Sequence, residues 1–176
     1  MILTTIKNNN VTYYDLPKNI LPLLMSKNNE LYQHIEMSDI EKMIRIYFVI
    51  DVYDIDYDTE SILNDTLFLL NFTFTTNNDD WAIVSFEKNI GVYYKRTFSF
   101  YSKKKKISLK MLRDIGNKLF TIYKHINLYK YYPKTKDPIG YCLLLPFQSK
   151  YRMEVLQGSV EDCIIRDIDG LEETIF

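Results

Sequence analysis

The fold is decided by the stretch from Trp81 to Tyr101, which reads WAIVSFEKNIGVYYKRTFSFY. The first half is an apolar run that ends at Glu87, and in the second half Val92, Tyr94, Phe98 and Phe100 mark one face opposite polar residues such as Thr97 and Ser99. The turn-forming residues 89–91 separate the halves. Alternation with a period of two is typical of a half-buried β-strand, and a short connection joins two such strands into an antiparallel hairpin. The sequence therefore predicts neighbouring strands at about 81–87 and 92–101.

The residues before this hairpin show a similar alternation. Apolar residues occupy every second position from Phe68 to Phe74, with Asn71 and Thr73 on the other face, and the turn cluster 77–80 follows. This pattern predicts another strand. Three strands with short polar connections predict an antiparallel meander over about 66–101.

After the meander the period of the apolar residues changes to that of a helix. They recur at three- and four-residue steps, at Leu112, Ile115, Leu119, Ile122, Tyr123 and Ile126. One apolar stripe with polar residues on the opposite side predicts a helix over about 108–127. We expect the lysine run that precedes it to be a loop.

A second helix is predicted over about 39–53. Residues 38–41 (Ser-Asp-Ile-Glu) match a capping box, in which the Ser side chain accepts from the N3 amide and the Glu side chain reaches back. Apolar residues follow at helical spacing as far as Tyr47. Beyond about residue 48 the pattern also fits a strand, but we interpret the segment as a helix.

The flanking segments add shorter elements. Residues 2–6 and 11–15 predict a hairpin, residues 18–26 a short helix, and residues 141–145 and 151–156 two further strands. Together these elements predict an α+β fold with an antiparallel sheet of about four to six strands. The two main helices, 39–53 and 108–127, would pack on one face of that sheet. The length fits a single domain over residues 1–176.

Composition limits the cellular setting. Phe, Tyr, Met, Ile, Asn and Lys dominate, and these residues have AT-rich codons, which suits an AT-rich bacterium, its phage or a virus. No apolar run reaches the roughly 18 residues of a membrane span, and the N-terminus does not resemble a secretory signal. Only two cysteines occur, which fits a reducing compartment. We therefore expect the protein in the cytoplasm of a bacterium, or of the host cell if it is viral.

Charged residues are segregated along the chain. Residues 1–87 carry a net charge of −9, residues 88–136 carry +13, and residues 137–176 carry −5. Such asymmetry is a hint of an anionic partner. The densest basic part, Lys103–Lys106, would lie at a helix start, where free N–H groups favour anions. The plainer alternatives are a solvated loop, or acidic ends that fold over the basic centre.

No pattern of catalytic residues stands out. The chain lacks the motifs G-x-x-x-x-G-K-[ST], G-x-G-x-x-G and G-x-S-x-G. Its two histidines, His34 and His125, and its two cysteines, Cys142 and Cys163, show no spacing typical of a metal site or a catalytic pair. We therefore expect no enzyme activity and no cofactor.

One acidic run resembles part of a calcium-binding loop. Asp54, Asp56 and Asp58 alternate as calcium ligands do. Such a loop requires Gly at its sixth position and Glu at its twelfth, where this chain has Thr59 and Asp65. A solvated acidic loop or a docking patch for a basic partner is the better interpretation, and no metal is expected.

The leading hypothesis is a small non-catalytic interaction protein that binds and neutralises a macromolecular partner. An immunity protein against a bacterial toxin, or a viral or phage anti-defence factor, would fit the size and the segregated charge. A protein partner is expected, with charge complementarity supplying fast association more than affinity. The candidate contact residues are Asp51, Asp54, Asp56 and Asp58 for a basic partner, and Lys103, Lys104, Lys105, Lys106 and Lys110 for an acidic one.

Two other classes of function stay open. The first is nucleic-acid binding through the basic segment 88–136, whose tyrosines could stack on bases. The second is an enzyme that uses Asp or Glu residues in a cleft that the sequence does not reveal.

Overall fold

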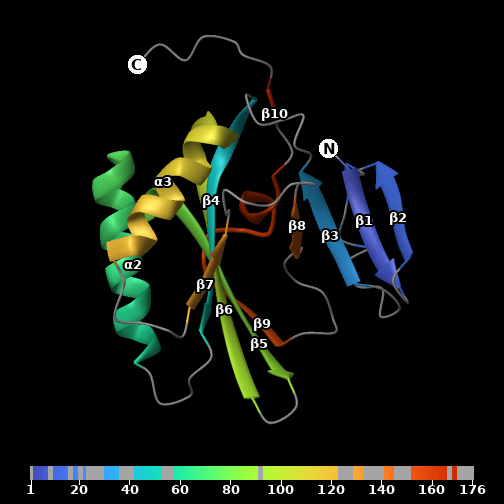
Figure 1. Ribbon diagram of the computed structural model, residues 1–176, viewed down its shortest axis with the longest axis horizontal. Coiled ribbons are helices and arrows are strands. Elements are labelled where there is room, and N and C mark those ends of the chain that lie inside the picture. Colours follow the sequence, from blue (N-terminus) through green and yellow to red (C-terminus); the bar gives the residue numbers. More distant parts are fainter. Residues whose placement is uncertain are drawn as a thin grey trace.

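The protein forms two antiparallel sheets and two long helices, α2 and α3, in the part of the chain that the structure describes (Figure 1). This computed structural model describes residues 2–7, 10–15, 18–19, 22, 30–35, 42–52, 58–90, 93–122, 129–132, 141–144, 152–165 and 168–169. The α+β class and the antiparallel pairing predicted from the sequence are confirmed.

The larger sheet is built around one β-α-β-β-α-β unit. Its elements are, in chain order, β4 (Met43–Val52), α2 (Thr59–Phe74), β5 (Trp81–Ile90), β6 (Tyr93–Ser108), α3 (Leu109–Ile122) and β7 (Tyr129–Tyr132). The strands lie in the order β7-β4-β6-β5, and each neighbouring pair is antiparallel. This is the split βαβ, or ferredoxin-like, arrangement. Beyond β5 the sheet continues with β9 (Arg152–Gln157), and β10 (Ile168–Asp169) pairs with the start of β4.

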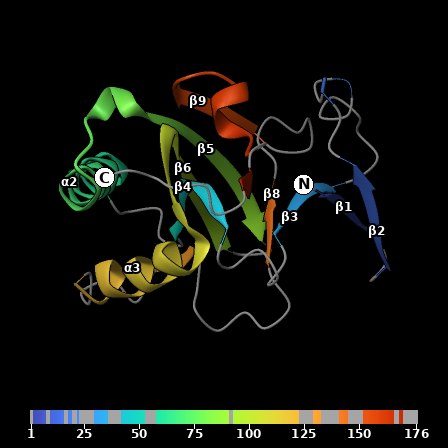
Figure 2. The ribbon, with the colours of Figure 1, turned by 90° about the horizontal axis from the view of Figure 1, so that it is seen from above.

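Both helices cover the same face of this sheet because of the connectivity. β4 and β5 are parallel with β6 between them, and β6 and β7 are parallel with β4 between them. Crossover connections between parallel strands are right-handed almost without exception. The two crossovers run in opposite directions across the sheet and start from antiparallel strands, so right-handed connections bring α2 and α3 to one side. Figures 1 and 2 show them there.

The smaller sheet lies beside the larger one in Figure 1. Its strands have the order β2-β1-β3-β8, where β1 is Ile2–Lys7, β2 is Asn10–Asp15, β3 is Glu30–Ile35 and β8 is Tyr141–Leu144. The predicted hairpin of residues 2–6 and 11–15 is confirmed as the antiparallel pair β1 and β2. The strand predicted at 141–145 is confirmed as β8.

The hydrophobic core fills the space between the larger sheet and the two helices and continues on the opposite face of the sheet, where it includes Tyr47, Tyr101 and Cys163. Phe74 of α2 packs with its ring centroid 6.0 Å from that of Phe48 in β4 and 6.3 Å from that of Trp81 in β5. Trp81 is fully buried, and its Nε1 donates to Asn71 Oδ1 at 2.9 Å and to Thr76 Oγ1 at 3.1 Å. The indole therefore joins β5 to the C-terminal end of α2 by both its apolar face and its polar edge.

The helix predicted over 39–53 is wrong from residue 43 onward. Residues 43–52 form strand β4, the first strand of the β-α-β-β-α-β unit. Its residues from Ile44 to Val52 are buried almost without interruption, because β4 is covered on both faces. A strand buried on both faces carries a continuous apolar run, which also satisfies helical spacing. The capping-box residues 38–41 lie outside the described residues.

The strand predicted at the start of the meander is also wrong. Residues 59–74 form α2, so the predicted three-stranded meander is reduced to the hairpin of β5 and β6. In α2 the buried residues are Ile62, Thr66, Leu67, Leu70 and Phe74, at three- and four-residue steps. The apolar residues from Phe68 to Phe74 fit both the period of a strand and the period of a helix, because α2 carries apolar residues on its outward face as well as on its inward face.

The remaining elements agree with the sequence. The strands predicted at 81–87, 92–101 and 151–156 are β5, β6 and β9, and the helix predicted at 108–127 is α3 over Leu109–Ile122. Most of the short helix predicted at 18–26, and residues 123–127, lie outside the described residues. Within the described part of the chain, neither helix is both long and apolar enough to span a bilayer.

Candidate interaction surfaces

The sheet face opposite the helices is closed by the segment 158–165. In RNA-recognition domains of this general architecture, aromatic residues on the open sheet face stack on bases. Here the corresponding aromatic residues of the two central strands are buried, with Tyr47 at 0% and Tyr101 at 2% exposure. This region of the sheet is therefore not available for base stacking.

Arg45 fastens the covering segment to the sheet. Its Nη1 donates to the carbonyl oxygens of Ser102 at 3.2 Å and Asp162 at 2.9 Å, and its Nη2 donates to the carbonyl of Ile164. At the start of the segment, Gly158 has φ +88°, and a Cβ there would lie 2.7 Å from the Cβ of Ala82. Glycine is thus required both for the backbone conformation and for the close approach to β5.

Cys163 lies within this segment, and its side chain is fully buried. Burial, together with the nearby carboxylate of Asp162, raises the pKa of Cys163 to about 12. Only the thiolate is nucleophilic, so at neutral pH the side chain is a buried apolar group.

The acidic candidate residues have separate locations. Asp51 is 4% exposed, and its carboxylate accepts from Lys95 Nζ at 2.9 Å and from Thr97 Oγ1 at 2.6 Å. It therefore forms an internal contact between β4 and β6 and is not the surface contact residue that the sequence suggested. Asp54 and Asp56 lie outside the described residues.

Asp58 is exposed and caps α2. Its side chain accepts from the backbone N–H groups of Glu60 and Ser61 at 3.1 and 3.3 Å, and from Ser61 Oγ at 2.6 Å. The hydrogen bonds from Ser61, with a further one from Glu60, hold the pKa of Asp58 below its usual value. Its role in the structure is that of a helix N-cap.

The lysine run Lys103–Lys106 is not a loop before the long helix, as predicted, but part of strand β6, in which residues 102–105 form an irregular bulge. Tyr101 pairs with Tyr47 and Lys106 pairs with Arg45, so the four residues 102–105 oppose a single residue of β4. The Ser102 hydroxyl accepts from the backbone N–H of Lys105 at 2.8 Å and closes the bulge. The alternating apolar pattern ends at Tyr101, which is why the sequence indicated a loop.

From the sequence we expected the lysines at the start of the long helix, but the bulge directs one of them to the end of the other helix. Lys105 Nζ donates to the carbonyl of Phe74, at the C-terminal end of α2, where the helix dipole favours a cation. Lys104 and Lys105 are exposed, and Lys110 is exposed in the first turn of α3. The start of α3 is capped by Ser108, whose hydroxyl accepts from the N–H of Met111 at 3.1 Å.

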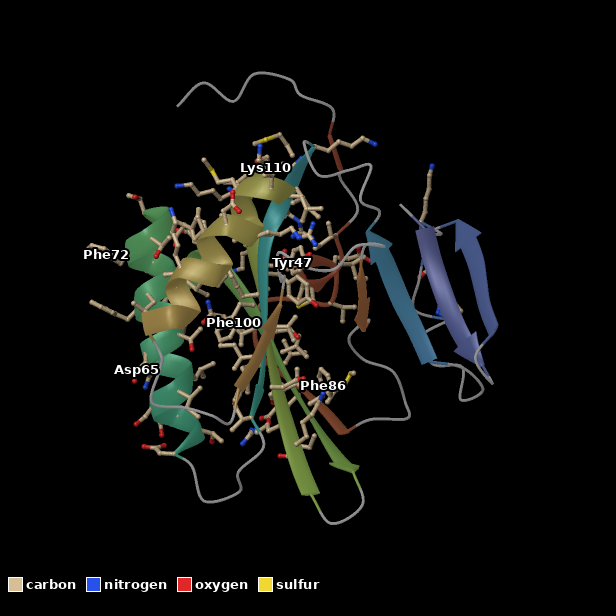
Figure 3. The ribbon with its side chains drawn as sticks, viewed as in Figure 1. Tyr47, Asp65, Phe72, Phe86, Phe100 and Lys110 are labelled. Atoms are coloured by element: carbon tan, nitrogen blue, oxygen red, sulfur yellow. The ribbon has the colours of Figure 1, made fainter. Side chains whose placement is uncertain are left out.

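The outer face of α2 carries two exposed phenylalanines. Phe68 is 69% and Phe72 is 81% exposed, and they lie one helical turn apart (Figure 3, where Phe72 and Asp65 are labelled). Residues 58–80 contain five acids, all exposed, and no Lys or Arg. Sequence reasoning missed this surface because it assigned Phe68 and Phe72 to a buried strand face.

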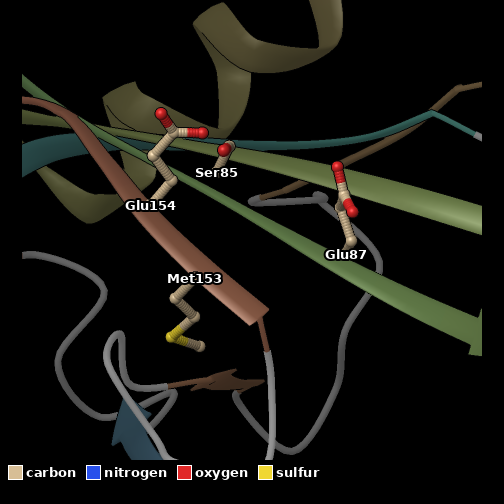
Figure 4. Close-up of a pocket in the computed structure, with 4 residues that line it drawn as sticks. All are labelled: Ser85, Glu87, Met153 and Glu154. Carbon is tan, nitrogen blue, oxygen red and sulfur yellow. The ribbon is translucent and has the colours of Figure 1, made fainter.

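A pocket of about 260 Å³ lies where β5 pairs with β9, and its lining residues Ser85, Glu87, Met153 and Glu154 define what we name the carboxylate pocket. Figure 4 shows Ser85, Glu87 and Glu154 projecting to one side of the sheet and Met153 to the other. No group of three or more His, Cys, Asp or Glu residues that could hold a metal ion is found in the described part of the chain.

The backbone of β3 places His34 opposite Cys142 of β8, and His125 lies outside the described residues. No protein-family model matches this chain, and neither a curated protein nor a solved structure matches it. Any function must therefore be argued from the surfaces themselves.

Proposed function

We propose that this protein is a small non-catalytic interaction protein that acts in the cytoplasm by binding and neutralising a basic protein partner through the outer face of α2. The partner would be a bacterial toxin, which makes the chain an immunity protein, or a defence protein, which makes it a viral or phage anti-defence factor. The observation that carries this proposal is the exposure of Phe68 and Phe72 on one helix face.

Two aromatic residues on a helix surface are unfavourable in the isolated protein and favourable in a complex. Burying a Phe side chain contributes about 1.5–3 kcal/mol, and aromatic residues are typical anchors of protein interfaces. Phe68 and Phe72 are four residues apart, which is the spacing with which a helix fills an apolar groove. The inward face of α2 is fixed by core contacts such as that of Phe74 with Phe48, so the helix is already ordered before binding.

The charges around the phenylalanines define the chemistry of the partner. Glu60 and Asp65 lie on α2 itself, and Asp79 and Asp80 follow in the short helix η2 (Asn78–Asp80). All are exposed, and no basic residue lies between positions 58 and 80. A groove edged by Lys and Arg is complementary to this surface, and a protein that acts on nucleic acid would carry such residues.

The test is affinity capture with a matched pair of variants. Tagged wild-type protein is used in the source cell, or in a cell that also expresses the product of the neighbouring gene, and is compared with F68S/F72S and with M111S. Met111 is an exposed apolar residue of α3, at 46% exposure, so M111S controls for the loss of surface apolar area. We expect one basic protein at a ratio near 1:1, lost with F68S/F72S and retained with M111S.

Three outcomes would contradict the proposal. The first is equal capture by wild type and F68S/F72S. The second is capture that disappears on nuclease treatment, which would support nucleic-acid binding. The third is Phe-dependent self-association in analytical ultracentrifugation, which would make the occupant a second copy of this chain.

A further inference from the structure

The outward residues of α2 form one stripe along the helix. Ser61, Asp65, Phe68 and Phe72 follow one another at steps of four, three and four residues, and all of them are exposed. Such steps place side chains above one another on a single helix face. Figure 3 shows Asp65 and Phe72 on the side of α2 that points away from the sheet. A partner that contacts this stripe therefore meets carboxylate and aromatic groups together.

Carboxylates lie at both ends of the aromatic pair. Asp58 and Glu60 lie at the N-terminal end of α2, and Asp79 and Asp80 follow its C-terminal end in η2. Two of these carboxylates are held in place by backbone N–H groups, because Asp58 accepts from the first turn of α2 and Asp80 accepts from Asn77 at 2.8 Å. The 16 residues of α2 span about 24 Å. The surface is therefore a preformed row of two rings with anions on either side.

Two basic side chains reach the ends of α2 from β6. Arg96 Nη1 donates to Thr59 Oγ1 at 3.4 Å, and Lys105 Nζ donates to the carbonyl of Phe74. Nε of Arg96 also lies 3.9 Å from a carboxylate oxygen of Glu87. The five acids of residues 58–80 are all exposed and outnumber these two cations, so the surface keeps an excess of negative charge over them.

A surface of rings and anions presents the same kinds of chemical group as a nucleic-acid strand. Proteins that bind single strands combine a basic groove with aromatic side chains on which the bases stack. Phe rings can stack on those aromatic side chains as bases do, and carboxylates can pair with Lys and Arg of the groove as phosphates do.

The spacing of the rings favours a single strand over a duplex. Phe68 and Phe72 are four residues apart, which is about 6 Å along the helix axis. Successive phosphates along one strand of a duplex are only about 3.4 Å apart in the axial direction. The two rings therefore fit the places of separated bases better than those of stacked ones.

We propose that α2 enters the single-strand nucleic-acid site of its partner, with Phe68 and Phe72 in the places of two bases and the flanking carboxylates in the places of phosphates. The inference rests on the proposed function and identifies the partner as a protein that binds single-stranded DNA or RNA. Neutralisation is then competitive, because the partner holds either this chain or its nucleic acid.

The experiment is a displacement assay on the partner that wild-type protein captures after nuclease treatment. The bead-bound complex is challenged with oligodeoxyuridylate and oligouridylate of about 20 nucleotides, longer than the roughly 4–16 nucleotides of such a site. A DNA duplex of the same length and inorganic polyphosphate are the controls, at equal phosphate concentration. We expect a single strand to release the partner at a concentration about tenfold lower than polyphosphate, which has no bases to stack. The more effective single strand identifies DNA or RNA as the competing ligand, because the two differ only in the 2′-OH.

A matched pair of variants tests the carboxylates. Wild-type protein and variants displace a labelled oligonucleotide from the partner, and fluorescence anisotropy follows the displacement. D65N removes a carboxylate from the stripe and should raise the concentration needed for half-displacement about threefold, as for an exposed ion pair. E154Q removes an exposed carboxylate from β9 and should leave that concentration unchanged.

Failure of this inference and failure of the proposed function give different results. If the partner binds this chain and a single strand at once, or if polyphosphate or the duplex releases it as readily as a single strand, the inference is overturned while the proposed function stands. Equal effects of D65N and E154Q would also overturn it. If F68S/F72S captures the partner as well as wild type does, or if wild type captures none, the proposed function fails and the inference fails with it.

Discussion

Asp51 shows why the local sequence does not reveal whether a charged residue is exposed or buried. The sequence shows an acid after an apolar run, which is compatible with the end of a buried element or with an exposed loop. In the structure Asp51 lies inside β4, and its partner Lys95 comes from the basic segment. The pairing depends on the register of β4 against β6, a long-range property that no local pattern contains.

The contact of Asp51 with Lys95 can be measured by a double-mutant cycle. K95M leaves the carboxylate of Asp51, whose side chain is 6% exposed, without its cationic partner. We expect K95M to lower the free energy of unfolding by about 2–4 kcal/mol, because an uncompensated buried charge is strongly unfavourable. The double variant D51N/K95M should be more stable than the sum of the single effects predicts, by about 1 kcal/mol or more.

Urea unfolding provides the measurement for the whole cycle. D65N, which removes an exposed carboxylate from α2, is the matched control and should change stability by less than about 0.5 kcal/mol. Strict additivity of D51N and K95M would show that the two side chains do not interact.

At the scale of elements, the sequence could predict those marked by turn residues or by a single dominant period. The turn residues 89–91 separate the two strands of the hairpin of β5 and β6, although much of each strand is buried on both faces, and the apolar residues of α3 recur with one period. The sequence could not predict β4, which is buried on both faces, or α2, which is apolar on its inward and outward faces. The exposed Phe residues that hid the helical period of α2 are the same ones that mark the candidate docking surface.

The helical period of α2 can be tested by paired substitutions. A strand would place Phe68, Leu70 and Phe72 on one face with similar burial, whereas α2 buries Leu70 to 1% exposure and leaves the two phenylalanines exposed. We expect L70A to lower the free energy of unfolding by about 2–5 kcal/mol, as for other buried leucines. F68A and F72A should each change it by less than about 0.5 kcal/mol. Similar losses for all three variants in urea unfolding would contradict the helix.

At the scale of the whole molecule, the three charge segments of the sequence are joined by contacts. Lys95 of the basic segment pairs with Asp51 of the acidic N-terminal segment, and Arg96 lies 3.9 Å from Glu87. In the C-terminal segment, burial acts to raise the pKa of Asp162, but hydrogen bonds from Ser159 and the charges of Lys103 and Arg45 lower it below its usual value. These contacts support the alternative in which the acidic ends fold over the basic centre.

If attraction between the segments stabilises the fold, salt should weaken it. We expect the free energy of unfolding to fall by about 0.5–2 kcal/mol between 0.02 and 0.5 M NaCl, because exposed and half-buried pairs are screened over this range. The measurement is the urea midpoint at each salt concentration, with D51N/K95M as the variant that should respond less. Stability that is constant or rises with salt would instead indicate that repulsion within each segment outweighs attraction between them. In that case the net positive charge of the basic segment would favour an anionic partner, and nucleic-acid binding through Lys103–Lys106 would regain support over a protein partner at α2.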